Sequence, residues 1–536
     1  MSGAALERPA AATLLCIAIA LFIVSASRLV AVPGLQYDEV LFVNAALGEP
    51  AQGLFVAKRL LGVPVMLMGY VGALKAYLYF PVFQAFGVSP ATIRWPVILL
   101  SALTLWLAYG VARCSFGRVV SAMFVLVIAA DPVFVSLTTL DVGPVALMLF
   151  LKLAALLCAL RAVTTGRPGY LWGVTIACAL GIFDKLNFIW FVLALALTAG
   201  LLFRAELVAI LRRNRAGFLL PVFALGIVAA VATFGLILPQ LIASQAQQSG
   251  VGAVDRLRYV LGLYARTMEG REFYHLVTKS VLNAHSPVNV LTALGTLGLG
   301  TLTLARAGRS VGLRPGVLSD RIVAGHLLLF VLIGLQLLIT KKAWGPHHVM
   351  MLYPFHLLVV LAAAARMAGS VGAVVTAGVL TVSGLHVGSA YARRFQPTEE
   401  FEAQWSPVIG DLVDWLDERA PDRIASVDWG THNQIVALGS PHTRAAARDL
   451  WPYFRVPRES EAQRLLFERE FQGRDVLAVL FGPQWDIMPQ VRSGFNAWAA
   501  SVGLRPRRVR EFRSPNGTVI YEVYAIADSL FPRADR

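Results

Sequence analysis

The chain has 536 residues, of which 57% are hydrophobic and only 15% are charged, and its mean hydropathy is +0.65. An ordinary soluble domain carries about 25% charged residues, and a soluble chain could not hide so much apolar surface. The net charge of +15 would fit a nucleic-acid-binding protein, but many of the basic residues stand in short loops between apolar blocks, where they set membrane topology. The composition therefore excludes a soluble globular protein and disfavours a nucleic-acid partner.

The apolar residues gather in blocks of about 20, the length that crosses a bilayer as a helix. They predict a polytopic α-helical membrane protein with about eleven transmembrane helices. The stretch 169–203 is too long for one span and is broken at Asp184 and Lys185, so we interpret it as two helices joined by a tight turn. The predicted spans are 11–31, 91–112, 118–135, 142–160, 169–183, 187–203, 217–238, 288–305, 322–340, 346–365 and 370–390.

Alternate loops between these spans differ in charge. One set is short and rich in arginine, as in RCSFGR and RRNR, whereas the other set is long or carries acids, as in QYDEV. The positive-inside rule places the arginine-rich loops and the N-terminus in the cytoplasm. We therefore expect a multi-pass protein of the cell inner membrane, with a transmembrane domain over 1–394 and an extracytoplasmic domain over 395–536.

The segment 395–536 has the composition of a soluble domain. SPVIGDLVDWLDERAP predicts a helix with Ser406 as its N-cap, and RIASVDWG and DVLAVLFG predict buried strands. Asn516–Gly517 predicts a turn into a further strand. These elements indicate a small C-terminal α/β domain.

Two outer loops, 34–90 and 239–287, are unusually long, and long loops on one face often carry function. The first contains GALKAYLYFPVFQAFG, which predicts a helix lying along the membrane interface. Ionisable residues near a bilayer are costly and invite a functional interpretation. Those that the topology brings to the outer face are Asp38, Glu39, Lys75, Arg94, Asp131, Asp141 and Lys185.

Three segments of the chain resemble the membrane-embedded type C glycosyltransferases. They are QYDEV after the first span, GALKAYLYFPVFQAFGVSPATIRWP, and the LD of TTLDVGP. The resemblance covers roughly residues 10–390 and is greatest to the family 39 group, which includes protein O-mannosyltransferases and the lipid A aminoarabinose transferase. It implies transfer of a sugar from a polyprenyl-phosphate-linked donor on the outer face. It also implies that Asp38 is a base or metal ligand, Asp141 a second acid and Lys75 a ligand of the donor phosphate.

The chemistry of such a transfer predicts roles for the charged residues of the outer face. The acceptor hydroxyl needs a carboxylate as base, for which Asp38 is preferred and Glu39 is the alternative. The departing phosphate needs a cation, which Lys75, Arg94 or Lys185 supplies. Asp131 either supports Asp141 or caps a helix.

Where related enzymes often carry an arginine–tyrosine pattern in a late outer loop, this chain has WGPHHVMMLYP. We assign His347, His348 and Tyr353 from that segment to substrate binding. Oxygen and nitrogen ligands from Asp38, Asp141 and a histidine would also permit a divalent metal ion as cofactor.

A single displacement would invert the sugar. The sequence leaves the acceptor open among protein, lipid and polysaccharide, and the alternative function is a transporter or flippase of a lipid-linked substrate. Transporters often show paired halves with broken helices, and we find no such internal symmetry.

Overall fold

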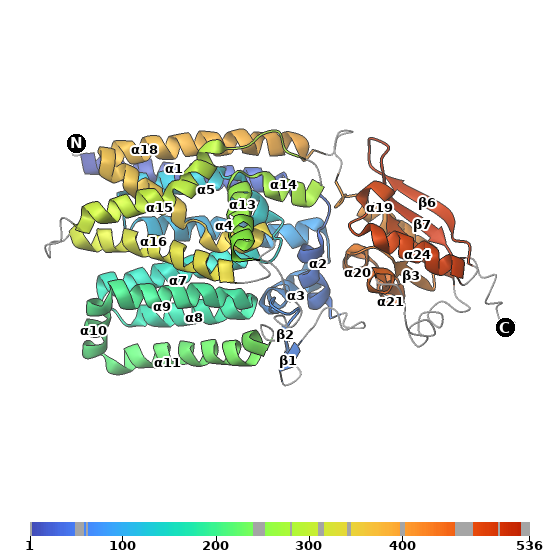
Figure 1. Cartoon of the computed structure of the whole chain (residues 1–536), viewed down its shortest axis with the longest axis horizontal. Helices are drawn as coiled ribbons and strands as arrows, with labels where there is room; N and C mark the ends of the chain where they lie inside the picture. The colour runs from blue at the N-terminus through green and yellow to red at the C-terminus, as the bar shows by residue number, and fades with distance from the viewer. Residues whose placement is uncertain are drawn as a thin grey trace.

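In the computed structural model, a long bundle of helices carries a small sheet domain at one end (Figure 1). The structure describes residues 3–48, 58–60, 63–239, 252–278, 281–308, 316–339, 345–396, 403–455, 475–501 and 504–526. The long helices run side by side along the bundle, and α10 connects α9 to α11 at the end opposite the sheet. The helices of the bundle are α1 (Gly3–Ser27), α4 (Pro90–Ala112), α5 (Arg118–Ala130), α6 (Pro132–Thr139), α7 (Val145–Thr165), α8 (Gly169–Asp184), α9 (Ile189–Leu202), α10 (Arg204–Arg213), α11 (Arg215–Ala232), α15 (Pro287–Gly308), α16 (Gly316–Ile339) and α18 (Phe355–Arg394).

The prediction of a multi-pass helical membrane protein is confirmed. Within the described ranges, six helices are long and apolar enough to cross a membrane, or eight if each of two bent pairs is one span. Three of the eleven predicted spans account for the difference: α8 is a shorter apolar helix, α15 is not among the candidates, and α18 counts once although two spans were predicted there. A break in α18 at Ala368 and Gly369 divides it into two arms. The second arm contains the predicted span 370–390, whereas the predicted span 346–365 begins before the first arm, in α17 (Pro346–Val349) and the irregular turn that follows it.

The predicted turn within 169–203 is present and also anchors the first outer loop. Lys185 is extended between α8 and the short 3₁₀ helix η1 (Leu186–Phe188), which leads into α9. On either side of Lys185, Gly72 N donates to Asp184 O at 2.9 Å and Leu186 N donates to Tyr70 O at 2.9 Å. The segment before α3 is thus fixed by backbone hydrogen bonds to the α8–α9 turn.

The two long loops fold into short elements at the sheet end of the bundle (Figure 1). The predicted interfacial helix is α3, which buries Lys75 and Tyr79 and exposes Leu78, Phe80 and Phe86. An exposed apolar face of this kind suits a helix at a membrane surface. Helix α3 spans Leu74–Phe86. The other elements of these loops were not predicted; they are α2 (Tyr37–Leu47), β1 (Lys58–Leu60), β2 (Val63–Met66), α13 (Ala253–Met268) and α14 (Arg271–Thr278).

The C-terminal region is the predicted α/β domain, with a five-stranded sheet in the order β4-β3-β5-β7-β6. β3 is parallel to β4 and β5, whereas β7 is antiparallel to β5 and β6. The two predicted buried strands are β3 and β5, and Gly517 takes the left-handed conformation (φ 85°) at the predicted turn. The elements are α19 (Ile409–Arg419), β3 (Arg423–Ser426), α20 (Thr431–Leu438), α21 (Pro441–Ala446), β4 (Ala447–Asp449), α22 (Trp451–Arg455), β5 (Val476–Phe481), η4 (Pro483–Trp485), α24 (Pro489–Ser501), β6 (Arg507–Arg513) and β7 (Val519–Ala525).

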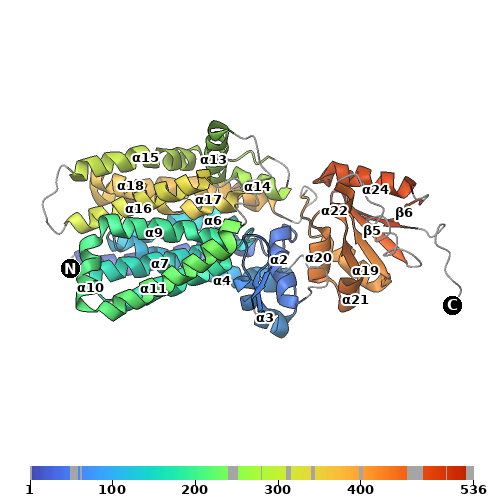
Figure 2. The ribbon, with the colours of Figure 1, turned by 60° about the horizontal axis from the view of Figure 1, so that its bottom comes forward.

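The sheet domain rests directly on α2, and α20 lies beside that helix in both views (Figures 1 and 2). Gly34 N donates to Trp405 O at 2.8 Å. Gln434 Nε2 donates to Leu35 O at 2.6 Å. The ring of Tyr37 stacks on Trp429 with centroids 4.3 Å apart. The first outer loop is therefore held from the bundle side and from the domain side.

The close approach of Gly72 to the α8–α9 turn generates a stability prediction. A Cβ at Gly72 would lie 1.6 Å from the Phe183 carbonyl oxygen, which is backbone and cannot swing aside. Overpacking of this kind typically costs about 1–3 kcal/mol, so we expect Gly72→Ala to lower the thermal unfolding temperature in detergent. The matched control is Gly200→Ala in α9, where a Cβ meets nothing within 4 Å and the unfolding temperature should hold. Equal unfolding temperatures for the two variants would contradict this packing.

Candidate active site

Asp38 and Glu39 begin α2 but lie in different surroundings. Gln36 caps the helix: its side-chain oxygen accepts from Asp38 N at 2.6 Å, and its own backbone N–H donates to Glu39 Oε2 at 3.1 Å. This reciprocal cap fixes the first turn. Asp38 remains half-buried, whereas Glu39 is fully buried. Of the two neighbouring acids, Asp38 is the accessible one.

Glu39 forms a two-pronged ion pair with Arg94 of α4, Nε to Oε1 at 2.6 Å and Nη2 to Oε2 at 2.8 Å. The remaining guanidinium donors go to backbone carbonyls of the loop that links α1 to α2. The acceptors are Leu29 O (2.8 Å), Val30 O (3.1 Å), Pro33 O (2.7 Å) and Gly34 O (3.1 Å). Every nitrogen of Arg94 is engaged and its side chain is 0% exposed, which leaves no donor for a phosphate. We assign this pair to holding the loop in place, not to the base or phosphate-binding roles considered from the sequence.

Lys75 and Asp141 form a second buried ion pair. Asp141 Oδ1 also accepts from Ala146 N at 2.7 Å, so both of its oxygens are engaged by protein donors. The Lys75 ammonium lies 4.6 Å from the centroid of the Phe42 ring. Burial alone would lower the pKa of Lys75, but the Asp141 carboxylate outweighs it and raises the pKa above its ordinary value. Asp141 thereby keeps Lys75 charged.

Lys185 is the second cation beside Asp38. Its ammonium donates to Gly143 O at 2.7 Å and lies 5.8 Å from the centroid of the Tyr70 ring. Burial lowers the pKa of Lys185 to about 8, with Asp38 acting in the opposite direction. Burial likewise raises the pKa of Asp38, and Lys185 and then Lys75 oppose that rise. Asp38, Lys75 and Lys185 are therefore electrostatic neighbours, contributed by three separate parts of the chain.

His347 and His348 lie in α17 (Pro346–Val349) and border the same region. A Cβ at Gly143 would be 2.7 Å from His347 Cδ2, and the ring of His348 lies 5.7 Å from that of Tyr70. In the described part of the chain, neither ring nitrogen of His347 has a hydrogen-bond partner, which leaves both able to meet a polar ligand.

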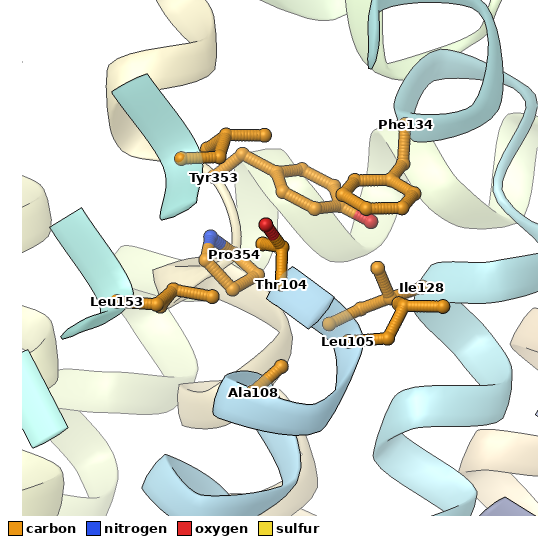
Figure 3. Close-up of a pocket in the computed structure, with 9 residues that line it drawn as sticks. Thr104, Leu105, Ala108, Ile128, Phe134, Leu153, Tyr353 and Pro354 are labelled. Carbon is orange, nitrogen blue, oxygen red and sulfur yellow. The ribbon is translucent and has the colours of Figure 1, made fainter. Parts of the chain in front are cut away.

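Tyr353 and Asp131 are not part of this group. Tyr353 packs in the interior of the bundle, where it lines a small apolar cavity together with Thr104 and Pro354 (Figure 3). Asp131 caps α6, with Oδ1 accepting from Val133 N at 2.9 Å. The sequence left Asp131 either to support Asp141 or to cap a helix, and this contact is a helix cap. Tyr353 is 1% exposed, and its position offers no support for substrate binding.

Two further buried side chains were not assigned a role from the sequence. Lys152 of α7 donates to the carbonyls of Met350 (3.1 Å), Met351 (2.9 Å) and Tyr353 (2.5 Å), and so fixes the irregular turn that follows the histidines. The signal was a lone lysine inside the apolar run LFLKLAA. Asp184 is 0% exposed, and neither of its carboxylate oxygens has a partner among the described residues.

The predicted acids do not form a metal site. Among the residues that the structure describes, no three His, Cys, Asp or Glu side chains form a group that could hold a metal ion. Both oxygens of Asp141 are already taken by Lys75 and Ala146. We therefore derive no chemistry through a metal.

The Glu39–Arg94 pair generates a second stability prediction. Removing one partner of a buried ion pair typically costs about 3–5 kcal/mol, so Glu39→Gln should lower the unfolding temperature markedly. Asp38→Asn, one residue away and half-buried, is the matched control and should unfold near the parent temperature. Thermal unfolding of the two purified variants makes the comparison. Unchanged stability in Glu39→Gln would contradict the structural role of the pair.

Comparison with known proteins gives the following relationships. The family model described as dolichyl-phosphate-mannose-protein mannosyltransferase matches residues 72–234, a segment that contains Lys75, Arg94, Asp141 and Lys185. No curated protein matches the sequence.

The fold is similar to that of solved oligosaccharyltransferases. The structure of AglB from Archaeoglobus fulgidus, in complex with an inhibitory peptide and a dolichol-phosphate, is 12% identical with a TM-score of 0.50, over 97% of this chain and 75% of that one. The A. fulgidus oligosaccharyltransferase in complex with Zn and sulfate is 11% identical with a TM-score of 0.52, over 97% and 74%. ArnT from Cupriavidus metallidurans in the apo state is 14% identical with a TM-score of 0.48, over 97% and 98%. Residues 72–234 are thus similar to the mannosyltransferase family, and the chain shares the fold of the solved oligosaccharyltransferases.

Proposed function

We propose that the protein transfers a sugar from a polyprenyl-phosphate-linked donor to an acceptor hydroxyl on the outer face of the cytoplasmic membrane. The observation that carries the proposal is the half-buried Asp38 at the start of α2, with the buried Lys75 ammonium 4.6 Å from the ring of Phe42, one turn along the same helix, and the buried Lys185 ammonium 5.8 Å from the ring of Tyr70. A carboxylate and two cations are what a displacement at a sugar phosphate requires. The matching family model names a dolichyl-phosphate-mannose donor, and the structure of AglB holds a dolichol-phosphate.

Asp38 acts as the general base. Since burial raises its pKa, Asp38 binds a proton more readily than an exposed carboxylate, which favours proton abstraction near neutral pH. The acceptor hydroxyl gives its proton to Asp38 as its oxygen attacks the anomeric carbon. The bond between that carbon and the phosphate oxygen breaks in the same step, so the sugar is inverted.

Lys75 and Lys185 stabilise the departing phosphate. Their positions are fixed before reaction, Lys75 by Asp141 and Lys185 by the Gly143 carbonyl, and preorganised charge of this kind is often the largest catalytic contribution. A phosphate diester leaves as a monoester anion, so the reaction needs no general acid. His347, which packs against Gly143, and His348, beside Tyr70, contribute hydrogen bonds to the substrate.

A transporter or flippase of a lipid-linked substrate is the second function considered. The midplane of the membrane is where transporters usually bind substrate. Here Asp38, Lys75 and Lys185 belong to the loops and turns at the sheet end of the bundle. This position favours chemistry at a membrane surface over transport.

We propose that the cytoplasmic face carries the N-terminus and that the outer face carries the domain 395–536, next to a transmembrane domain over 1–394. The arginine-rich loops support this orientation. The acceptor, whether protein, lipid or polysaccharide, would then approach from the side of the sheet domain, which rests on α2 and therefore beside Asp38.

The orientation predicts the behaviour of topology reporters. A reporter fused after Arg394 should be active only if it requires an extracytoplasmic location, and one fused within 204–215 only if it requires the cytoplasm. The second fusion is the control for expression and insertion. A cytoplasmic signal after Arg394 would overturn the orientation.

The role of Asp38 predicts a large loss of turnover on Asp38→Asn, which keeps the shape of the side chain and removes its charge. A general base contributes about 10²–10⁴-fold, and turnover should fall by that factor at matched expression. The assay uses a polyprenyl-phosphate sugar and the acceptor identified by comparing the glycans of a deletion strain with those of its parent. Asp131→Asn is the matched control, because asparagine also caps helices and Asp131 lies apart from the site. Normal turnover in Asp38→Asn would remove Asp38 from the mechanism.

A further inference from the structure

A groove runs along the outside of the bundle between α1 and the second arm of α18. It encloses about 830 Å³, part of it open to the surroundings, and its floor is the junction of α5 and α6. The α1 wall includes Leu21, Val24 and Arg28, and the α18 wall includes Leu385 and Gly388. The groove belongs to none of the segments that form the candidate active site.

The groove opens toward the membrane. Both of its walls belong to helices long and apolar enough to cross a bilayer, and Val24 and Leu385 are 54% and 41% exposed. Small residues make its floor, Ala129 and Ala130 among them. From Leu21 to Arg28 the α1 wall is about 10 Å long at the rise of an α-helix. These dimensions suit one hydrocarbon chain lying against the protein.

The outer end of the groove is basic. Arg28 lines it and is exposed. Arg393 and Arg394, the last residues of α18, do not line the groove but are exposed and stand between the lining residues Ala392 and Phe395. None of the described residues that line the groove is acidic. Both helices end next to the outer loops, at the level where lipid head groups lie. A chain-shaped apolar groove with cations at the head-group level is complementary to an anionic lipid.

We propose that this groove is a binding site for an anionic phospholipid, with one acyl chain in the groove and the phosphate against Arg28. The site is separate from the one proposed for the sugar donor. Two features connect it to the rest of the molecule: the loop after Arg28 is the one that Arg94 grips, and Phe395 at the end of the groove leads toward the sheet domain. The bound lipid therefore stabilises the loop that carries Asp38.

A second copy of the chain is a less suitable occupant. In a two-fold pair the same surface is used by both copies, so the three arginines of one copy would approach those of the other. A lipid phosphate neutralises these charges, whereas a second copy adds to them.

The test measures lipid binding to the purified full-length chain by native mass spectrometry and thermal unfolding, with phosphatidylglycerol and phosphatidylcholine as probes. The parent should retain phosphatidylglycerol preferentially and unfold at a higher temperature in its presence. Arg28→Gln should weaken phosphatidylglycerol binding about fivefold, the factor that one arginine near an anionic surface contributes, with no change for phosphatidylcholine. Arg167→Gln, an exposed arginine at the opposite end of the bundle, is the matched control and should bind like the parent.

Gly388→Leu tests the groove itself. A Cβ at Gly388 meets nothing within 4 Å, so a leucine can occupy the groove without disturbing the fold, and it should abolish the preference for phosphatidylglycerol. Equal binding of the two lipids by the parent would overturn the proposal. So would parent-like binding by both Arg28→Gln and Gly388→Leu, or a dimer that Gly388→Leu dissociates. Because the readout is lipid binding, its failure is distinct from a failure of the proposed sugar transfer.

Discussion

The buried ion pair between Glu39 and Arg94 is the interaction on which the outer face of this protein depends. Arg94 stands in the first turns of α4, yet its guanidinium binds the α1–α2 loop and the first turn of α2 together. The same loop also binds the sheet domain, because Gly34 N donates a hydrogen bond to Trp405 O. A buried charge without its partner is strongly destabilising, so only one arrangement of this loop satisfies both side chains. One membrane helix, the candidate base and the C-terminal domain are thus fixed relative to one another by a single guanidinium.

The remaining charges lie next to this fixed loop and are held in the same manner. Asp141 and the Gly143 carbonyl each hold one lysine, and both belong to the short turn between α6 and α7. No residue of the described ranges holds the Asp38 carboxylate in this way, and Asp38 is half-buried. Burial acts on the two kinds of group in opposite directions, raising the pKa of Asp38 and lowering that of Lys185 to about 8. In such a site the two ammonium groups are fixed in position, and one carboxylate remains able to take a proton.

Much of the membrane architecture could be predicted from the sequence because the bilayer imposes a length and a polarity on each helix. Most predicted spans fall on a helix, on one arm of α18 or on a bent helix pair, whereas 346–365 includes α17 and an irregular turn before α18. The helix α3 follows from its aromatic, amphipathic sequence. Asp38, Lys75, Asp141 and Lys185 could be proposed as one group because topology alone brings them to one face.

The separate roles of Asp38 and Glu39 could not be predicted from the sequence. Adjacent residues on a helix point to different sides, and only the position of Arg94 distinguishes these two acids. Tyr353 follows the histidines closely in sequence, but the irregular turn held by Lys152 directs it into the bundle. The short elements of the two outer loops depend on tertiary contacts, such as the pairing of Tyr70 and Gly72 with the α8–α9 turn, that no local pattern reveals.

The central claim is that this site breaks the bond between a sugar and a polyprenyl phosphate. The most direct measurement gives purified protein, reconstituted in vesicles, a polyprenyl-phosphate sugar labelled in the sugar, with a nucleotide sugar carrying the same label in a parallel reaction. We expect labelled product and free polyprenyl phosphate from the lipid-linked donor only, with inverted configuration at the anomeric carbon. Transfer from the nucleotide sugar, or movement of the intact lipid-linked donor across the membrane without release of its sugar, would contradict the account.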